Sequence, residues 1–455
     1  MRTRVHDQLH LIPAAIAHVH ARELLQMSAV LDELPEATRL VHADLLGRGG
    51  KRVDPGKGRE GMSAERVLRA MIVKQMNGFS YEELAFHLAD SNTYRSFCRL
   101  GLDQDAPKKS TLQKNIKLVR AETWEAINRQ LVLHAAASGI ESGTKVRTDC
   151  TVVESNIHHP TDSSLLWDCV RVLARLMGQA NEDFGLSFTD HSLRAKRRAM
   201  GILNAKSNTQ RVPLYRDLLK VTEKTLSSAE RVAGELDEVN AGDLMALVRA
   251  AAVAQQLRHY GDLAKRVISQ TQRRVLGGES VPAGEKLVSI FEPHTDIIVK
   301  DKRETLYGHK ICLTSGASGL VTDVVVEEGN PADSTLAVKM VERQRELYGE
   351  APRQVSFDGG FTSRSNLAAI KALGVTDVAF SKGRGLQIAE MVKSTWVYRR
   401  LRNFRAGVEG TISFLKRVFG LDRCGWSSFG SFKAYVCGSV LACNLLVVAR
   451  HLLEV

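Results

Sequence analysis

The stretch RQVSFDGGFTSRSNLAAIKALGVTDVAF, residues 353–380, decides the fold. It begins with a short apolar run, Val355–Asp358, and ends with another, Val375–Phe380, and both have the length of a strand. Between them, Ser363–Leu373 has the apolar spacing of a helix. A strand, a helix and a second strand in this order are typical of an α/β fold. The first strand ends in Asp358, which two glycines follow.

Further strands are predicted on the N-terminal side of this stretch. Alternating apolar and polar residues at Val288–Phe291, Gly308–Thr314 and Leu320–Glu327 predict three strands separated by glycine-containing turns. Earlier in the chain, residues 145–149 and 151–157 predict a hairpin. Residues 163–285 between these groups are helical in pattern and very basic. We therefore expect a mixed α/β core that is interrupted by a large helical insertion.

Three acidic residues stand where a metal-dependent nuclease needs them. Asp149 and Asp358 each end a predicted strand, and Glu409 lies in a late helical segment. Carboxylate oxygens are the ligands that Mg²⁺ prefers, and two metals roughly 3.5–4 Å apart activate a water and stabilise the leaving oxygen of a phosphodiester. Asp149, Asp358 and Glu409 are therefore the candidate catalytic and metal-binding residues.

Two basic residues flank Glu409 on its predicted helix. At ~100° per residue, Arg405 and Lys416 fall on the same helix face as Glu409. A carboxylate between two cations can bind a metal and also guide a phosphate backbone. The alternative is a solvent-exposed helix with an i,i+4 ion pair, which contributes only a few tenths of a kcal/mol.

The spacing from Arg405 to Glu409 to Lys416 resembles a known signature. It is similar to the C-terminal signature of bacterial insertion-sequence transposases, which carry a DDE site on a ribonuclease H-like fold. In that signature a Tyr stands three residues before the Arg, whereas this chain has Arg402 there. Tyr398 is an aromatic residue that could reach the same face.

Other segments resemble the same family, in the same order, over about residues 60–450. They are the first-aspartate region Thr148–Ser163, the strand Tyr307–Lys310, the second-aspartate strand end Phe357–Phe361 and part of the closing helix, Leu441–Leu445.

The resemblance implies a transposase whose ribonuclease H-like catalytic domain covers residues 141–455. Asp149, Asp358 and Glu409 would bind two Mg²⁺, with Mn²⁺ as a substitute. A metal-activated water would cut the 3′ end of the element, and the freed 3′-hydroxyl would attack target DNA. Arg405 and Lys416 would offset phosphate charge. The implied partners are double-stranded DNA, as terminal inverted repeats and as target, and further copies of the chain, because a dimer or larger synaptic complex processes two ends together.

The N-terminal part is predicted to be a DNA-binding region. Residues 1–59 have the pattern of an arm and a cationic, glycine-rich linker, and residues 60–140 have that of short helices joined by turns, which suits a helix-turn-helix-like reader. Lys108 and Lys109 stand at the start of the third of these helices, where cations oppose the helix dipole and an external anion would be favourable. An ordinary helical bundle is the alternative.

The helical insertion carries its densest basic cluster at residues 194–198. Arg197 and Arg198 are therefore candidate DNA contacts, although a run of charges is also compatible with a solvated helix face.

Composition favours the same class of partner. The chain has 455 residues and a net charge of +12, which favours a polyanion, with nucleic acid first and an anionic membrane second. Its seven cysteines include no CxxC pair, so neither a zinc ribbon nor a redox motif is indicated. No signal peptide is recognisable, and Ala434–Ala449 predicts a buried helix rather than a membrane span. We expect a cytoplasmic, nucleoid-associated protein without a membrane partner.

Two other functions remain open from the sequence. One is a ribonuclease H-like DNA endonuclease that cuts without joining strands, and the other is an inactive DNA-binding relic.

Overall fold

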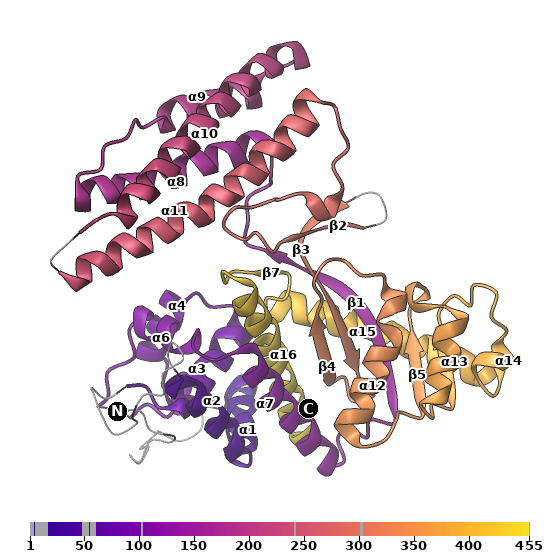
Figure 1. The fold of residues 1–455 in the computed structure, drawn as a ribbon. Coiled ribbons are helices and arrows are strands. Elements are labelled where there is room, and N and C mark those ends of the chain that lie inside the picture. The colour runs from indigo at the N-terminus through magenta and orange to yellow at the C-terminus, as the bar shows by residue number, and fades with distance from the viewer. Residues whose placement is uncertain are drawn as a thin grey trace. The chain divides into compact units, whose positions relative to one another are not determined.

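Figure 1 shows the computed structural model of the chain, which describes Arg4, Asp54 and residues 17–47, 61–101, 103–240, 243–300 and 304–454. The predicted linker at 47–58 lies almost wholly outside the described residues. The chain divides into two compact units. Unit 1 comprises Met1–Ser155 and Gly308–Val455, and unit 2 comprises Asn156–Tyr307.

Unit 1 is built on a mixed sheet whose central strand is β1 (Lys145–Ser155). On one side β1 pairs antiparallel with β3 (Glu304–Ser315), and on the other it pairs parallel with β5 (Gln354–Phe357). The strand order is β2-β3-β1-β5-β6, while β4 pairs with β3 and β7 pairs with β1; β2 and the first residues of β3 belong to the residue range of unit 2. The remaining strands are β2 (Asp296–Lys300), β4 (Val321–Val326), β6 (Asp377–Phe380) and β7 (Arg423–Cys424).

The strand-helix-strand prediction for residues 353–380 is confirmed. β5 and β6 pair in parallel, with Phe357 opposite Phe380, and α13 (Arg364–Ala372) connects them. Ser363 caps this helix by accepting a hydrogen bond from the Asn366 backbone N–H. The chain therefore has the mixed α/β architecture expected from its sequence.

Two strand predictions were wrong. The predicted hairpin over residues 145–157 is one continuous strand, because Arg147–Glu154 pair without interruption with β3 and no turn residue breaks the run. The predicted strand Val288–Phe291 is an irregular segment. Leu287, directly before this segment, exchanges two hydrogen bonds with the Gln270 side chain, and within the segment the Phe291 N–H donates to the Ser289 hydroxyl. Side chains therefore replace a neighbouring strand as hydrogen-bond partners.

Helices pack against the sheet and against one another in unit 1. The predicted capping box opens α4, where Ser80 and Glu83 exchange hydrogen bonds. The predicted third helix is two helices, α6 and α7, with separate starts at Lys109 and Ala121. The helices of unit 1 are α1 (Val19–Asp32), α2 (Pro35–Leu46), α3 (Ala64–Asn77), α4 (Tyr81–Asp90), α5 (Asn92–Phe97), α6 (Lys109–Ile116), α7 (Ala121–Ala137), α12 (Ala337–Tyr348), α13, α14 (Ile388–Met391), α15 (Thr395–Val418) and α16 (Phe429–Leu452).

The apolar C-terminal helix α16 lies in the core of unit 1, as the sequence predicted. Its length and composition would suffice for a membrane span, but 89% of its most apolar window is buried inside the protein. It packs on α1, α3 and α7. The buried Asn444 side chain accepts from the Val321 N–H at 2.9 Å and donates to the Val321 carbonyl at 2.7 Å, which fixes α16 to β4.

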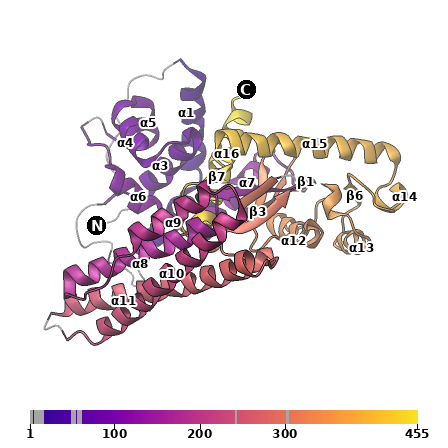
Figure 2. The same ribbon diagram turned by 90° about the horizontal axis from the view of Figure 1, so that it is seen from above.

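Unit 2 consists mainly of long helices with their own apolar core. In Figure 2, α8 (Asp162–Phe184), α10 (Asn208–Asp237) and α11 (Leu244–Thr271) run alongside one another, and α9 (Ser192–Asn204) packs on α8 and α10. Their inward faces form one cluster that includes Leu173, Leu218 and Val267. The predicted helical insertion is thus a compact helical unit.

Candidate active site

Adjacent strands and one helix position the three candidate carboxylates. Thr148 of β1 pairs with Phe357 of β5, so Asp149 and Asp358 each follow one member of a paired position on neighbouring parallel strands. Asp358 directly follows the end of β5, and Glu409 lies near the middle of α15, which packs on both strands. Three segments that are distant in sequence therefore meet here.

Helix α15 is fixed to the sheet by two side chains that each stand two residues before an aspartate of the site. Arg147 of β1 donates to the Phe404 carbonyl at 2.8 Å, and Ser356 of β5 donates to the Leu401 carbonyl at 3.0 Å. Gly407 permits this close approach, since a Cβ there would lie 2.0 Å from Arg147 Nη1. The helix position, and with it the position of Glu409, thus depends on buried polar contacts.

Arg405 lies among the three carboxylates and contacts each of them. Its Nη2 atom is 2.7 Å from Asp149 Oδ2 and 3.4 Å from Asp358 Oδ1, and its Nη1 atom is 2.7 Å from Glu409 Oε1. Because one nitrogen contacts both aspartates, their oxygens cannot be farther apart than these two distances together. The structure therefore brings Asp149, Asp358 and Glu409 around one guanidinium group.

The two aspartates differ in exposure and in pKa. Burial raises the pKa of Asp149, although Arg405 and the Cys150 N–H oppose the rise. Burial also acts to raise the pKa of Asp358, but hydrogen bonds from the Gly359 N–H and the Ser381 hydroxyl, together with the charge of Arg405, lower it overall. The Asp149 side chain is 14% exposed and that of Asp358 is 41% exposed, which explains the difference.

Unlike Arg405, the other predicted DNA-contact residues on α15 form no ion pair with the three carboxylates in the described structure. Lys416 contacts Asp422 at 3.4 Å, and Arg402 is exposed. Tyr398 donates its hydroxyl to the Phe380 carbonyl at 2.8 Å, so it ties α15 to the end of β6. Arg402 thus presents a cation to solvent where the family signature has a Tyr.

The other predicted DNA contacts lie on helix surfaces. Lys108 is the exposed N-cap of α6, and Lys109 forms a 2.8 Å ion pair with Glu82. In unit 2, Arg197 is exposed on α9, whereas Arg198 is paired with Asp217. Lys108 and Arg197 are therefore the more available cations of these four.

Several residues that organise the site were not singled out from the sequence. Ser381 donates to Asp358 Oδ1 at 2.8 Å, and Arg147 links β1 to both β3 and α15. Lys310, from a segment that resembles the family, contacts Asp333 and the Pro331 carbonyl rather than the carboxylates. The sequence offered one signal for these residues, Arg147 within the predicted strand at residues 145–149, because a buried cation requires specific partners.

A cation other than arginine could use the same oxygen atoms. Among the residues that the structure describes, no group of three His, Cys, Asp or Glu side chains forms a ready-made metal cage. The three carboxylates instead converge on Arg405. Their donor atoms are all oxygen, which matches the preference of Mg²⁺ and Mn²⁺.

Comparison with protein families identifies the class. A family model described as a transposase DDE domain matches residues 293–445, and one described as a transposase domain (DUF772) matches residues 21–118. Asp358 and Glu409 lie in the first range, and Lys108 and Lys109 lie in the second. Comparison with curated proteins and with solved structures gives no match.

The two matches define the class of the protein: it is a transposase with a DDE domain. More particularly, the chain belongs to the DDE transposases of insertion sequences. Proteins of this family act on DNA and generally use divalent metals.

Proposed function

We propose that the chain binds the terminal inverted repeats of its element, cleaves the element ends in a Mg²⁺-dependent reaction and joins them to target DNA. The catalytic domain would be ribonuclease H-like. The observation that carries the proposal is the convergence of Asp149, Asp358 and Glu409 on Arg405.

The residues present fit a pair of divalent cations. Asp149, Asp358 and Glu409 already surround one cation, the Arg405 guanidinium, and all their donor atoms suit Mg²⁺ or Mn²⁺. The buried Nε atom of Arg405 has no hydrogen-bond partner, so the guanidinium is not fully satisfied in this position. When bound, two divalent cations supply an activated water and stabilise the leaving oxygen of the phosphodiester.

In this reaction Arg405 would neutralise the phosphate. With cations on the carboxylates, its guanidinium is released to form paired hydrogen bonds to a phosphate, which is the acceptor that its planar fork matches. Glu409 lies one helical turn from Arg405, so carboxylate and phosphate contacts come from one rigid helix. Lys416 and Arg402 would contact the backbone on either side.

Two displacement steps at phosphorus would follow. In the first, the water oxygen bonds to phosphorus, the bond to the 3′ oxygen of the element breaks, and that oxygen takes a proton to become a free hydroxyl. In the second, this 3′ oxygen bonds to a phosphorus of target DNA, and a 3′ oxygen of the target leaves. In this second step one phosphodiester bond forms as another breaks, so the step needs no energy-rich co-substrate.

DNA binding would involve surfaces outside the carboxylate cluster. Lys108 and Lys109 on α6 and Arg197 and Arg198 on α9 belong to basic helices that could follow a phosphate backbone. Because two ends are processed together, we propose a homodimer or larger synaptic complex. The protein would act on nucleoid DNA in the cytoplasm.

The deciding experiment uses the DNA that flanks the gene. Labelled duplexes carrying either flank are incubated with the protein in Mg²⁺ or in EDTA, and a second set carries pre-cut 3′ ends together with a supercoiled target plasmid. We expect Mg²⁺-dependent nicking at the repeat boundary and joining of the pre-cut ends to the plasmid. Nicking without joining would identify an endonuclease, and binding without either reaction would identify an inactive relic.

A further inference from the structure

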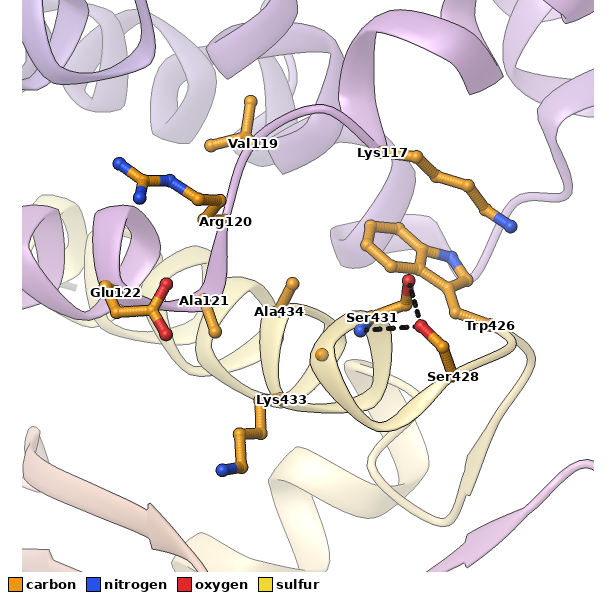
Figure 3. Close-up of a pocket in the computed structure, with 11 residues that line it drawn as sticks. Lys117, Val119, Arg120, Ala121, Glu122, Trp426, Ser428, Ser431, Lys433 and Ala434 are labelled. Atoms are coloured by element: carbon orange, nitrogen blue, oxygen red, sulfur yellow. Dashed lines mark hydrogen bonds between the residues drawn. The ribbon is translucent and has the colours of Figure 1, made fainter. Parts of the chain in front are cut away.

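A pocket lies in unit 1 between the first turns of α7 and α16 (Figure 3). Its volume is about 370 Å³, within the range of pockets that hold small ligands. Its polar lining comes from Lys117, Arg120, Glu122, Trp426, Ser428, Ser431 and Lys433. None of these residues contacts the carboxylate cluster around Arg405.

Two helices begin at this pocket. The N-cap of α7, Arg120, makes no side-chain capping hydrogen bond, and Glu122 is an acidic residue in the first turn. At α16, Ser428 accepts from the Ser431 N–H, and the first turn has no acidic residue. Backbone N–H groups at helix starts attract anions, and the start of α16 lacks an acidic residue such as the one that Glu122 supplies at α7.

One of the lining residues also carries an unpaired donor. The indole Nε1 atom of Trp426 has no hydrogen-bond partner, although the residue is only 5% exposed. Its ring is held between aromatic neighbours, with Tyr81 stacked at 6.4 Å and Tyr435 edge-on at 5.7 Å between ring centroids. A buried N–H without an acceptor is costly, so an acceptor that enters the pocket would relieve this cost.

Lys117 is the cation that is available to a ligand. Arg120 is paired with Asp44, and Lys433 lies over the Phe429 ring and 3.5 Å from Glu328. Lys117 is exposed, and within the described part of the chain it has no acidic partner. In Figure 3 the Lys117 side chain extends on the same side as the indole nitrogen, above the Ser428 and Ser431 hydroxyls, whereas Arg120 and Lys433 extend away.

We propose that this pocket binds a backbone phosphate of duplex DNA, through the Lys117 ammonium, the Trp426 indole N–H and the start of α16. The proposal rests on the proposed function, since it names a DNA contact of that transposase. DNA fits better than a free anion because the pocket joins both matched domains: Lys117 lies in the DUF772 range and Trp426 in the DDE range. A phosphate there would bind both domains at once.

The experiment measures duplex binding by fluorescence anisotropy over a series of salt concentrations. Trp426→Phe removes the N–H and keeps a ring, and we expect it to weaken binding roughly tenfold with an unchanged salt slope. Lys117→Ala removes one phosphate-neutralising charge, so it should weaken binding and reduce the slope of log K against log salt by about 0.9. Trp124→Phe is the matched control, because Trp124 Nε1 is also buried and unpaired but does not line the pocket.

The outcomes separate this proposal from the proposed function. If the wild-type protein binds no duplex, the proposed function fails. If it binds duplex and both pocket variants match Trp124→Phe, only the phosphate site fails. Tryptophan fluorescence gives a second readout. The Trp426 contribution is the part of the emission that is absent in Trp426→Phe. If inorganic phosphate changes this contribution and duplex DNA leaves it unchanged, the pocket holds a free anion and the DNA proposal is overturned.

Discussion

The carboxylate cluster and the α7–α16 pocket have opposite electrostatic character. At the cluster, three anions from β1, the end of β5 and α15 surround one internal cation, Arg405. At the pocket, a lysine, an indole N–H and two helix starts come together, and Glu122 is the one carboxylate among the described lining residues. The first region carries its own counter-charge, whereas the second presents unmatched donors.

This difference predicts different ligands for the two regions. At the carboxylate cluster, metal cations can replace the Arg405 guanidinium as the counter-charge. The guanidinium that is released can then bind a phosphate. A group of unmatched donors suits a permanent anion contact that adds affinity without chemistry. Catalysis and DNA binding should therefore respond to different substitutions.

The largest effect is expected for the three carboxylates. Asp149→Asn, Asp358→Asn and Glu409→Gln should each lower Mg²⁺-dependent end cleavage about 10³-fold or more, because each removes a charge that would bind a cation. Duplex affinity should stay near that of the wild type, since Lys and Arg contacts supply it. End-labelled duplexes resolved on gels measure the first effect, and anisotropy measures the second.

Glu346→Gln is the matched control for this series, because Glu346 is an exposed carboxylate on another helix, α12. Wild-type cleavage by any one of the three carboxylate variants would remove that residue from the site. A parallel loss of duplex binding would mean that the two regions are not functionally separate.

These residues also show how far the sequence reaches. Strand, helix and strand at 353–380 follow from local propensity and spacing, and the structure confirms them. The contact of Arg405 with Asp149 joins residues 256 positions apart, and no local pattern contains it. The strand-end and helix settings of Asp149, Asp358 and Glu409, together with the family resemblance, predicted one site, but neither predicted that the three carboxylates meet at Arg405.

The errors have physical causes of the same kind. Val288–Phe291 has a strand pattern, but side chains of Gln270 and Ser289 take the hydrogen bonds of the Leu287 and Phe291 backbone, and the segment is irregular. The pocket could not be predicted, because it depends on where the starts of α7 and α16 lie relative to each other. The unpaired indole N–H of Trp426 could not be predicted either, because it is a result of packing. Periodicity indicates which face of a helix is buried, but it does not show which polar atoms remain unpaired after packing.

The second prediction concerns the counter-ion itself. Arg405→Ala should lower end cleavage about 10²-fold, because the scissile phosphate loses its partner. In EDTA it should also lower the free energy of unfolding by about 1–2 kcal/mol, since three carboxylates are left without a cation and two of them are partly screened by solvent. Ca²⁺ should restore the melting temperature of the variant more than it raises that of the wild type.

Arg399→Ala is the control for this variant, because Arg399 is exposed on the same helix. Thermal unfolding is followed by circular dichroism in EDTA and in Ca²⁺. An equal Ca²⁺ response in Arg405→Ala, Arg399→Ala and the wild type would show that Arg405 does not occupy the place of a metal cation.

The third prediction tests two further cations of α15, the exposed Arg402 and the half-buried Lys416. Lys416→Ala and Arg402→Ala should each lower end cleavage about tenfold and leave the melting temperature nearly unchanged, since exposed ion pairs contribute only about 0–1 kcal/mol. Lys416 contacts only the well-exposed Asp422 among the acidic residues described, which supports a small structural role. Wild-type cleavage rates in both variants would show that this helix face does not touch DNA beyond Arg405.

The smallest effect is expected beside the pocket, at Lys74. Burial lowers the pKa of this lysine from 10.5 to about 8, although its ammonium lies 5.1 Å from the centre of the Tyr81 ring, which stacks on Trp426. A folded-state pKa below the unfolded value means that the charged lysine destabilises the fold. This cost is complete below about pH 8 and disappears as the pH rises towards 10.5, because the folded state then releases its proton first.

Lys74→Met keeps an unbranched side chain that is one atom shorter and removes the charge. It should raise the free energy of unfolding by about 1–2 kcal/mol at pH 7, which is less than the pKa shift alone gives because the contact with the Tyr81 ring is lost. The advantage should shrink steadily between pH 8 and pH 10. Urea unfolding of both proteins over this range measures the difference, and groups common to both cancel. A constant advantage at every pH would mean that Lys74 titrates normally and that this side of the pocket is not electrostatically strained.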